Sequence, residues 1–104
     1  MAERWAAFFE DRADGGAIRA EHVGAHQAFL RANKGKIVLV GALRPDAEGA
    51  PVGGLWIFEN VSGAEAEAII QSDPFYVNGL RASYKLLSWG VAPGFEAMVI
   101  QESL

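Results

Sequence analysis

The chain has 104 residues, which is enough for one hydrophobic core and too few for two. Hydrophobic residues make up 51% and charged residues 21%, a composition that is typical of a folded domain and excludes intrinsic disorder. Thirteen acidic against nine basic residues give a net charge of −4, which disfavours binding to the phosphate backbone of nucleic acids. The absence of cysteine excludes disulfides, thiolate metal sites and cysteine nucleophiles.

The apolar runs of the chain have the length of strands and are too short to cross a membrane. The residues after Met1 are Ala-Glu-Arg-Trp, which do not begin a signal peptide. We therefore expect a cytoplasmic protein with one domain over residues 1–104 and no nucleic-acid or membrane partner.

The first half of the sequence predicts a strand, a helix and a second strand. Residues 5–9 are a short apolar run rich in aromatic side chains, which favours a buried strand. Residues 18–33 contain only Gly24 as a turn former and end at an Asn-Lys-Gly sequence, which is typical of a helix and its C-terminus. Residues 37–40 are mostly β-branched and lie between glycines, so they predict a strand buried on both faces.

The second half predicts a strand over 52–61, a helix over 64–71, a long strand over 80–91 and a short last strand over 96–101, within a C-terminal tail of residues 95–104. Ser62 and Glu65 have the spacing of a capping box at the start of the second helix. Asp73-Pro74-Phe75 ends that helix and predicts a turn, because the residue before a proline disfavours helical geometry.

The predicted order is β-α-β-β-α-β, which is the ferredoxin-like arrangement of the α+β class, with an antiparallel sheet and both helices on one face. Three tryptophans are too many for one helix-covered face of so small a sheet. We expect the other face to carry much of a set of aromatic residues, namely Trp5, Phe9, Trp56, Phe58, Tyr84 and Trp89. An uncovered apolar sheet face favours a partner, so we expect a homodimer with the sheets packed face to face.

The first predicted helix carries both histidines of the chain. At about 100° per residue, His22, His26 and Arg19 fall on the same inward stripe as the apolar residues. Such polar groups either line a pocket or are satisfied within the core. His22 and His26 also have the i, i+4 spacing of metal ligands, but the sequence offers no third ligand and no H-E-x-x-H pattern, so we expect no metal.

Asp73 follows the second predicted helix and has two interpretations. Its carboxylate can accept backbone N–H groups of its own turn, which is the common role of an aspartate before proline. Alternatively it can reach an imidazole on the first helix, since both helices lie on one face, and so prepare that histidine for proton transfer. The sequence spacing does not choose between the two.

Several segments of the chain resemble the YCII-related (YciI-like) family. They are Arg19-Ala-Glu-His22-Val-Gly-Ala-His26-Gln-Ala-Phe29-Leu30, Ile37-Val-Leu-Val-Gly41-Ala-Leu43, Gly49-Ala-Pro-Val-Gly53-Gly54, the helix over 64–71, and Asp73-Pro74-Phe75 with Gly79-Leu80. The resemblance covers roughly residues 5 to 90. Two positions depart from the family pattern, Ala42 in place of the usual proline and Gln27 in place of leucine.

The resemblance implies a protomer of the dimeric α+β barrel superfamily, with an active-site His–Asp pair at His26 and Asp73 and with Arg19 matching the family's arginine. Members with assigned chemistry act on small aromatic or quinone-like rings, and one reaction is a dehydrochlorination. The departure at Ala42 lies near the pocket, so the substrate itself does not carry over.

These observations together predict a small cofactorless lyase or isomerase that acts on an aromatic, quinone or lactone substrate. His26 would be the general acid or base, Asp73 would orient it, and Arg19 would hold an anionic oxygen. His22 would form part of the pocket wall, and the flat walls would come from Trp5, Trp56 or Tyr84. The main alternative is a non-catalytic small-molecule-binding or accessory protein on the same dimeric scaffold. A haem-degrading or oxygenating member of the wider barrel group is a third alternative, with the fold as its only support.

Overall fold

The computed structural model describes residues 3–95. Its elements are, in chain order, β1 (Arg4–Asp11), α1 (Gly16–Ala32), β2 (Ile37–Leu43), β3 (Gly53–Glu59), α2 (Gly63–Ser72), α3 (Pro74–Val77) and β4 (Arg81–Ser88). All the elements predicted within this part of the chain are present, with ends that differ by a few residues. The last strand predicted over residues 96–101 lies outside the described residues.

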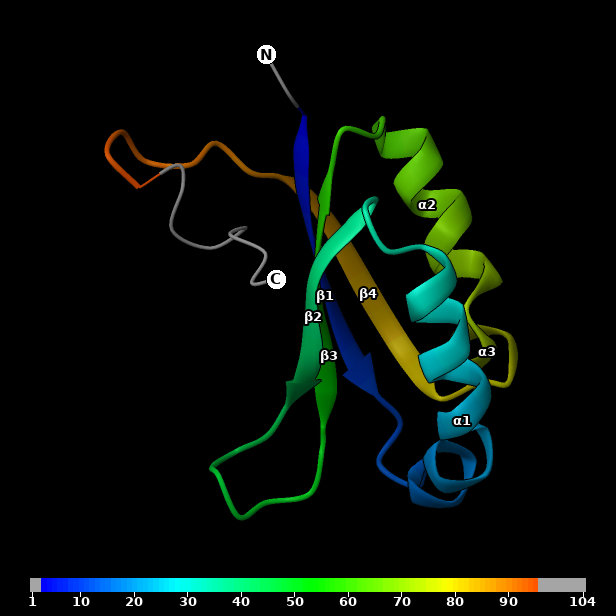
Figure 1. Ribbon diagram of the computed structural model, residues 1–104. Coiled ribbons are helices and arrows are strands. Elements are labelled where there is room, and N and C mark those ends of the chain that lie inside the picture. The colour runs from blue at the N-terminus through cyan, green and yellow to red at the C-terminus, as the bar shows by residue number, and fades with distance from the viewer. Residues whose placement is uncertain (1–2, 96–104) are drawn as a thin grey trace.

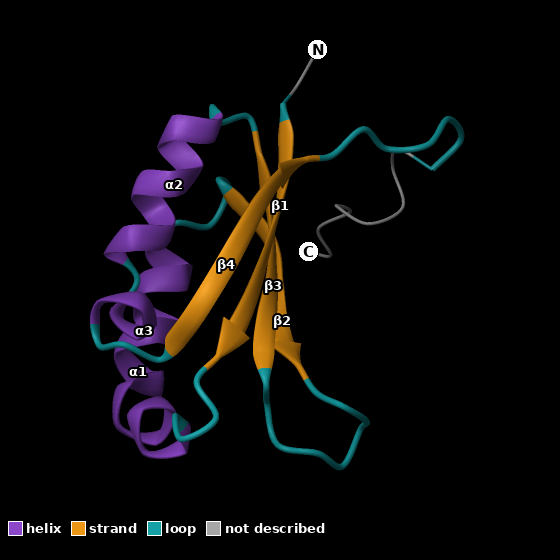
Figure 2. Ribbon diagram, turned by 180° about the vertical axis from the view of Figure 1, so that it is seen from behind, coloured by secondary structure: helices purple, strands orange, loops and turns teal. Residues whose placement is uncertain are grey.

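The four strands form one antiparallel sheet in the order β2-β3-β1-β4. All three helices cover the same face of this sheet and leave the other face without a helix (Figures 1 and 2). This is the ferredoxin-like α+β fold, as the sequence predicted. No helix among residues 3–95 is long and apolar enough to span a membrane.

The aromatic side chains divide between the two faces differently from the expectation. Successive residues along a strand point to opposite faces of the sheet, whereas residues paired directly across neighbouring strands point to the same face. Phe9 pairs with Gly54 of β3 and with Tyr84 of β4, so Phe9 and Tyr84 share a face. The core under the helices contains most of the aromatic residues that we expected on the outer face, namely Trp5, Phe9, Trp56, Phe58 and Tyr84. That expectation was wrong because these residues share the strand positions that face the helices, and hydrophobicity alone does not say which face the helices cover.

Trp89 of the predicted set does lie on the outer face, where it lines a shallow apolar hollow with Phe8, Leu55 and Leu87. Phe8 is 44% exposed and Leu87 is 53% exposed. The outer face is therefore apolar, although most of its side chains come from the strand positions that alternate with those of the predicted aromatic set.

The end of α2 leads directly into α3, so the predicted turn at Asp73 is instead the start of a short helix. Asp73 is the N-cap of α3, with its side chain accepting from the Phe75 N–H, and Pro74 occupies the first helical position. Proline is well tolerated there because the first-turn N–H groups have no helical partner. At the other end of α2, Ser62 accepts from the Glu65 N–H at 3.0 Å as predicted, while the Glu65 carboxylate pairs with Lys36.

Candidate active site

The α1 helix and the α2–α3 junction bring His26 and Asp73 together. The Nδ1 atom of His26 lies 2.7 Å from Oδ1 of Asp73, and both residues are buried. The same Oδ1 also accepts the Phe75 N–H at 3.2 Å. Both interpretations of Asp73 are thus met by one carboxylate, which caps α3 and binds the imidazole.

The contact fixes the orientation of the imidazole. Because an ionised carboxylate can only accept, Nδ1 of a neutral His26 carries the proton and donates it to Asp73. The ring also stacks on Phe75, with centroids 3.9 Å apart and planes 15° from parallel. The Nε2 atom is left with its lone pair and makes no hydrogen bond within residues 3–95, so it is the nitrogen able to exchange a proton with a ligand.

A cavity of about 390 Å³ opens beside this pair, between α1, β2, β3 and the start of β4. Its lining includes His26, Trp56, Phe75 and three arginines, Arg19, Arg44 and Arg81. A volume of this size is suitable for a single small ring compound. The cavity thus presents an imidazole, flat aromatic surfaces and cationic groups to the same small ligand.

Arg19 and Arg81 are held by one carboxylate at the end of β1. Asp11 accepts from Arg81 Nη1 at 2.7 Å and from Arg19 Nη2 at 2.5 Å. The side chain of Arg81 is 3% exposed, and its Nε has no hydrogen-bond partner among the described residues. Burial lowers the pKa of Arg81 below the usual value, and the hydrogen bond that Arg81 donates to Asp11 opposes that shift.

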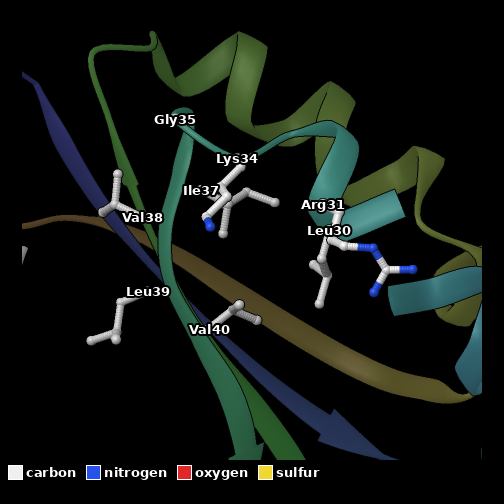
Figure 3. A pocket seen from close by; sticks show the side chains of 8 residues that line it. All are labelled: Leu30, Arg31, Lys34, Gly35, Ile37, Val38, Leu39 and Val40. Atoms are coloured by element: carbon white, nitrogen blue, oxygen red, sulfur yellow. The ribbon is translucent and has the colours of Figure 1, made fainter. Parts of the chain in front are cut away.

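A second cavity, of about 420 Å³, lies between the end of α1 and the beginning of β2. Leu30 and Val40 line both cavities, and Figure 3 shows their side chains facing one another across the gap between helix and strand. The remaining lining is aliphatic except for Arg31 and Lys34. The described residues that line it include no histidine, aspartate or glutamate, so they supply no group for acid–base chemistry near neutral pH.

The cavity beside His26 gathers only some of the other residues predicted for the site. Trp56 and Arg19 line it together with His26. His22 lies one turn away on α1, with its Nε2 3.8 Å from the Glu21 carboxylate, and does not line the cavity. Nor do Trp5 and Tyr84; a role for these three in substrate binding stays a prediction.

Trp5 donates to the Val61 carbonyl at 3.0 Å, and its ring lies against Gly63 at the start of α2. The Tyr84 hydroxyl donates to the Glu67 carboxylate and accepts from Gln71 at 3.2 Å. Both side chains therefore tie the sheet to α2. Residues 3–95 contain no cluster of three or more His, Cys, Asp or Glu side chains that could hold a metal.

Arg81 and its partner Asp11 were missed in the sequence. Simple alternation from Tyr84 and Leu86 places Arg81 on the outer face, with Lys85 and Leu87. The register shifts between Glu10 and Asp11, where Glu10 pairs with Ser83 but Asp11 pairs with Arg81. The extra residue, Ala82, turns Arg81 toward the helices. The sequence signal that could have indicated Arg81 is its position directly after Gly79-Leu80, close to the Asp-Pro-Phe segment of the site.

Comparison with solved structures identifies relatives of the same fold. A 5-chloro-2-hydroxyhydroquinone dehydrochlorinase (TftG) from Burkholderia phenoliruptrix AC1100, solved in complex with 2,5-dihydroxybenzoquinone, is 26% identical with a TM-score of 0.78, covering 86% of this chain and 95% of that one. A dimeric ferredoxin-like protein from Thermobifida fusca is 16% identical, with a TM-score of 0.51 and coverage of 88% and 92%. Protein Atu4242 from Agrobacterium tumefaciens is 14% identical, with a TM-score of 0.53 and coverage of 90% and 96%.

A search of curated proteins finds no match. The family model of the YCII-related domain matches residues 4–90, which include every strand and helix described above as well as His26 and Asp73. The resemblance drawn from the first helix and the Asp-Pro-Phe segment is confirmed, and this chain belongs to the YCII-related family.

Proposed function

We propose that this protein is a cofactorless lyase or isomerase that acts on a small aromatic, quinone or lactone ring, with His26 as general acid and base. The observation that carries the proposal is the buried hydrogen bond of 2.7 Å between His26 Nδ1 and Asp73, at the wall of a cavity of about 390 Å³. The similarity to a dehydrochlorinase, at 26% identity, supports a role in the conversion of a small molecule.

The proposed chemistry uses Nε2 of His26 as the site of proton exchange. Asp73 holds the Nδ1 proton and stabilises the imidazolium that forms when Nε2 takes a second one. Phe75 keeps the imidazole in its plane from one side, so that Nε2 meets the ligand at a fixed angle. Proton transfer by a positioned side chain contributes about 10²–10⁴-fold in rate, which suits a substrate whose ring protons are already acidic.

Dehydrochlorination of a chlorinated hydroxyhydroquinone is a reaction that these groups could perform alone. One hydroxyl proton moves to the ring carbon that carries chlorine, a second hydroxyl proton is removed, and chloride leaves with the electrons of the C–Cl bond. The products are a hydroxyquinone, chloride and one proton, so the balance needs no oxidant. A single imidazole that takes a proton from oxygen and returns it to carbon serves both proton movements.

The test is turnover of 5-chloro-2-hydroxyhydroquinone under nitrogen, followed by released chloride and by the absorbance of the hydroxyquinone. We expect His26→Ala to lower kcat/KM by about 10²–10⁴-fold, while Arg31→Gln, an exposed change in the last turn of the same helix, leaves it unchanged. Equal turnover by His26→Ala, with its fold verified by circular dichroism, would refute the proposal. Binding of the ring compound without turnover would favour the non-catalytic binding protein instead.

We also propose that two copies of this chain associate through the outer face of the sheet. Phe8 of β1 and Leu87 of β4 are about half exposed there, beside Leu55 and Trp89 of the same hollow. Leu39 of β2 extends this apolar surface toward the sheet edge and is 44% exposed. Contiguous apolar surface of this kind on a small domain is typical of an interface.

A further inference from the structure

The cavity beside His26 concentrates positive charge in an acidic protein. The chain has six arginines and a net charge of −4, yet three of those arginines line this one cavity. No aspartate or glutamate is among the described residues that line it. The charged side chains that line the cavity are therefore all basic, although acidic residues outnumber basic ones in the chain as a whole.

The carboxylates that lie behind the lining do not cancel these charges. Arg19 and Arg81 share the single carboxylate of Asp11, and Asp73 is bound to His26. The side chain of Arg44, the residue that follows β2, makes no ion pair or hydrogen bond within the described part of the chain. Among the side chains that line the cavity and the carboxylates that pair with them, three guanidinium groups outnumber two carboxylates by one when His26 is neutral.

Arg81 is fixed in position before any ligand arrives. Its guanidinium carbon lies 4.4 Å from the ring centroid of Phe9 and 5.3 Å from that of Phe75, and Asp11 holds one edge. Gly54 leaves space beside it, since a Cβ there would come within 3.5 Å of both Nη atoms. A rigid, desolvated cation of this kind is suited to bind an anion because little conformational entropy is lost.

We infer that the cavity selects planar ring compounds that carry an ionised oxygen, as hydroxyquinones and acidic enols do, with Arg81 and Arg44 as the residues that determine this preference. Arg81 would bind the oxygen inside the cavity, and Arg44 would attract and close over it from the mouth. The inference rests on the proposed function, because it names the class of ligand that the same site holds: the ionised oxygen is that of the hydroxyquinone product, or that of a substrate hydroxyl from which His26 has removed the proton.

The preference also fits the direction of proton transfer. A hydroxyl group conjugated to a quinone carbonyl is a vinylogous carboxylic acid, so it is ionised at neutral pH. Guanidinium groups that hold such an oxygen also stabilise the negative charge that develops when Nε2 of His26 removes a further proton. A ring of similar shape with no hydroxyl to ionise would leave the positive charge of the cavity without a counterpart.

The experiment compares two ligands of one ring system by isothermal titration, 2,5-dihydroxybenzoquinone and its neutral 2,5-dimethoxy analogue. We expect the wild-type protein to bind the dihydroxy compound at least tenfold more tightly, and added salt to weaken that binding. Arg44→Gln should reduce the affinity for the dihydroxy compound about five- to tenfold and leave the dimethoxy compound unaffected. Arg44 is the residue to change because it is exposed and unpaired among the described residues. Removal of Arg81 would instead deprive the buried Asp11 carboxylate of one of its ion-pair partners.

Arg31→Gln is the matched control, since it removes an exposed arginine that lines the other cavity. An equal affinity of the wild-type protein for both ligands, or an Arg44→Gln variant that binds the dihydroxy compound as tightly as the wild type, would overturn the inference. If turnover that depends on His26 persists in that case, the proposed function stands without the anion preference. If neither quinone binds, the inference fails, and turnover of the hydroxyhydroquinone alone decides the proposed function.

Discussion

The hydrogen bond between His26 and Asp73 predicts a large coupling energy between the two side chains. The perturbation is a double-mutant cycle of His26→Ala, Asp73→Ala and the double variant, with the free energy of unfolding as the readout. If the 2.7 Å contact joins an imidazole N–H to an ionised carboxylate, the coupling energy is about 1.5–3 kcal/mol.

The single changes have larger effects that the structure accounts for separately. Asp73→Ala removes the cap of α3, which costs about 1 kcal/mol, and leaves a buried imidazole N–H unpaired, which costs about 1–3 kcal/mol. His26→Ala removes the ring stacked on Phe75 and leaves the fully buried Asp73 with a single backbone donor. The double variant should be less destabilised than the sum of the two, because each single change already breaks the shared bond.

The assay is urea unfolding at fixed protein concentration, followed by the fluorescence of the tryptophans, of which Trp56 lies 6.1 Å from the His26 ring. Ser62→Ala is the control, since Ser62 also caps a helix but lies about 15 Å along α2 from Asp73. It should cost about 1 kcal/mol and add to His26→Ala without coupling. A coupling energy below about 0.5 kcal/mol for the His26 and Asp73 cycle would show that Asp73 only caps α3.

Three further outcomes follow from the packing. Burial, and after it the hydrogen bond to Glu67, raise the pKa of Tyr84 above 10. The stability that the neutral hydroxyl contributes is therefore present below pH 10 and is lost as the pH rises further. The difference in absorbance at 295 nm between the wild type and Tyr84→Phe should show ionisation of Tyr84 only above pH 10, and ionisation below that pH would contradict the prediction. Gly53→Ala would place a Cβ 2.0 Å from the Phe9 carbonyl oxygen and should lower the free energy of unfolding by about 1–3 kcal/mol. Gly24→Ala has open space around the new Cβ and should raise the free energy of unfolding by about 0.5–1 kcal/mol. Equal urea midpoints for the two variants would contradict this difference in packing. If two copies associate through the outer face, as proposed, Phe8→Glu should lower the mass measured by light scattering from that of a dimer to that of a monomer. A wild-type dimer whose mass is unchanged in the variant would exclude the outer face as the interface.

The sequence predicted the order of elements well because local signals decide it. Gly24 did not interrupt α1, and Ser62 marked the start of α2 correctly. The contact of His26 with Asp73 was predicted because the helix periodicity turned the histidine inward and the family resemblance paired it with the aspartate. Both signals lie within short segments whose geometry depends little on the rest of the chain.

The distribution of side chains over the sheet was not predictable in the same way. A register shift of one residue moves a side chain to the opposite face, and the bulge at Ala82 is what brings Arg81 into the cavity. The assignment of Phe9, Trp56 and Phe58 to the outer face failed because hydrophobicity alone does not say which parity of a strand meets the helices. These features depend on pairing between distant strands, which composition and periodicity do not determine.

The most direct test of the account is the protonation state of the two nitrogens of His26, measured by long-range ¹H–¹⁵N correlation on the ¹⁵N-labelled protein at pH 8. We predict that Nδ1 carries the proton, held by Asp73, and that Nε2 is unprotonated and that its signal shifts when 2,5-dihydroxybenzoquinone is added. His26→Ala identifies the signals, since His22 is the only other histidine of the chain. A proton on Nε2 with Nδ1 bare, or an Nε2 signal that does not respond to the quinone, would contradict the claim that this nitrogen is the base of the site.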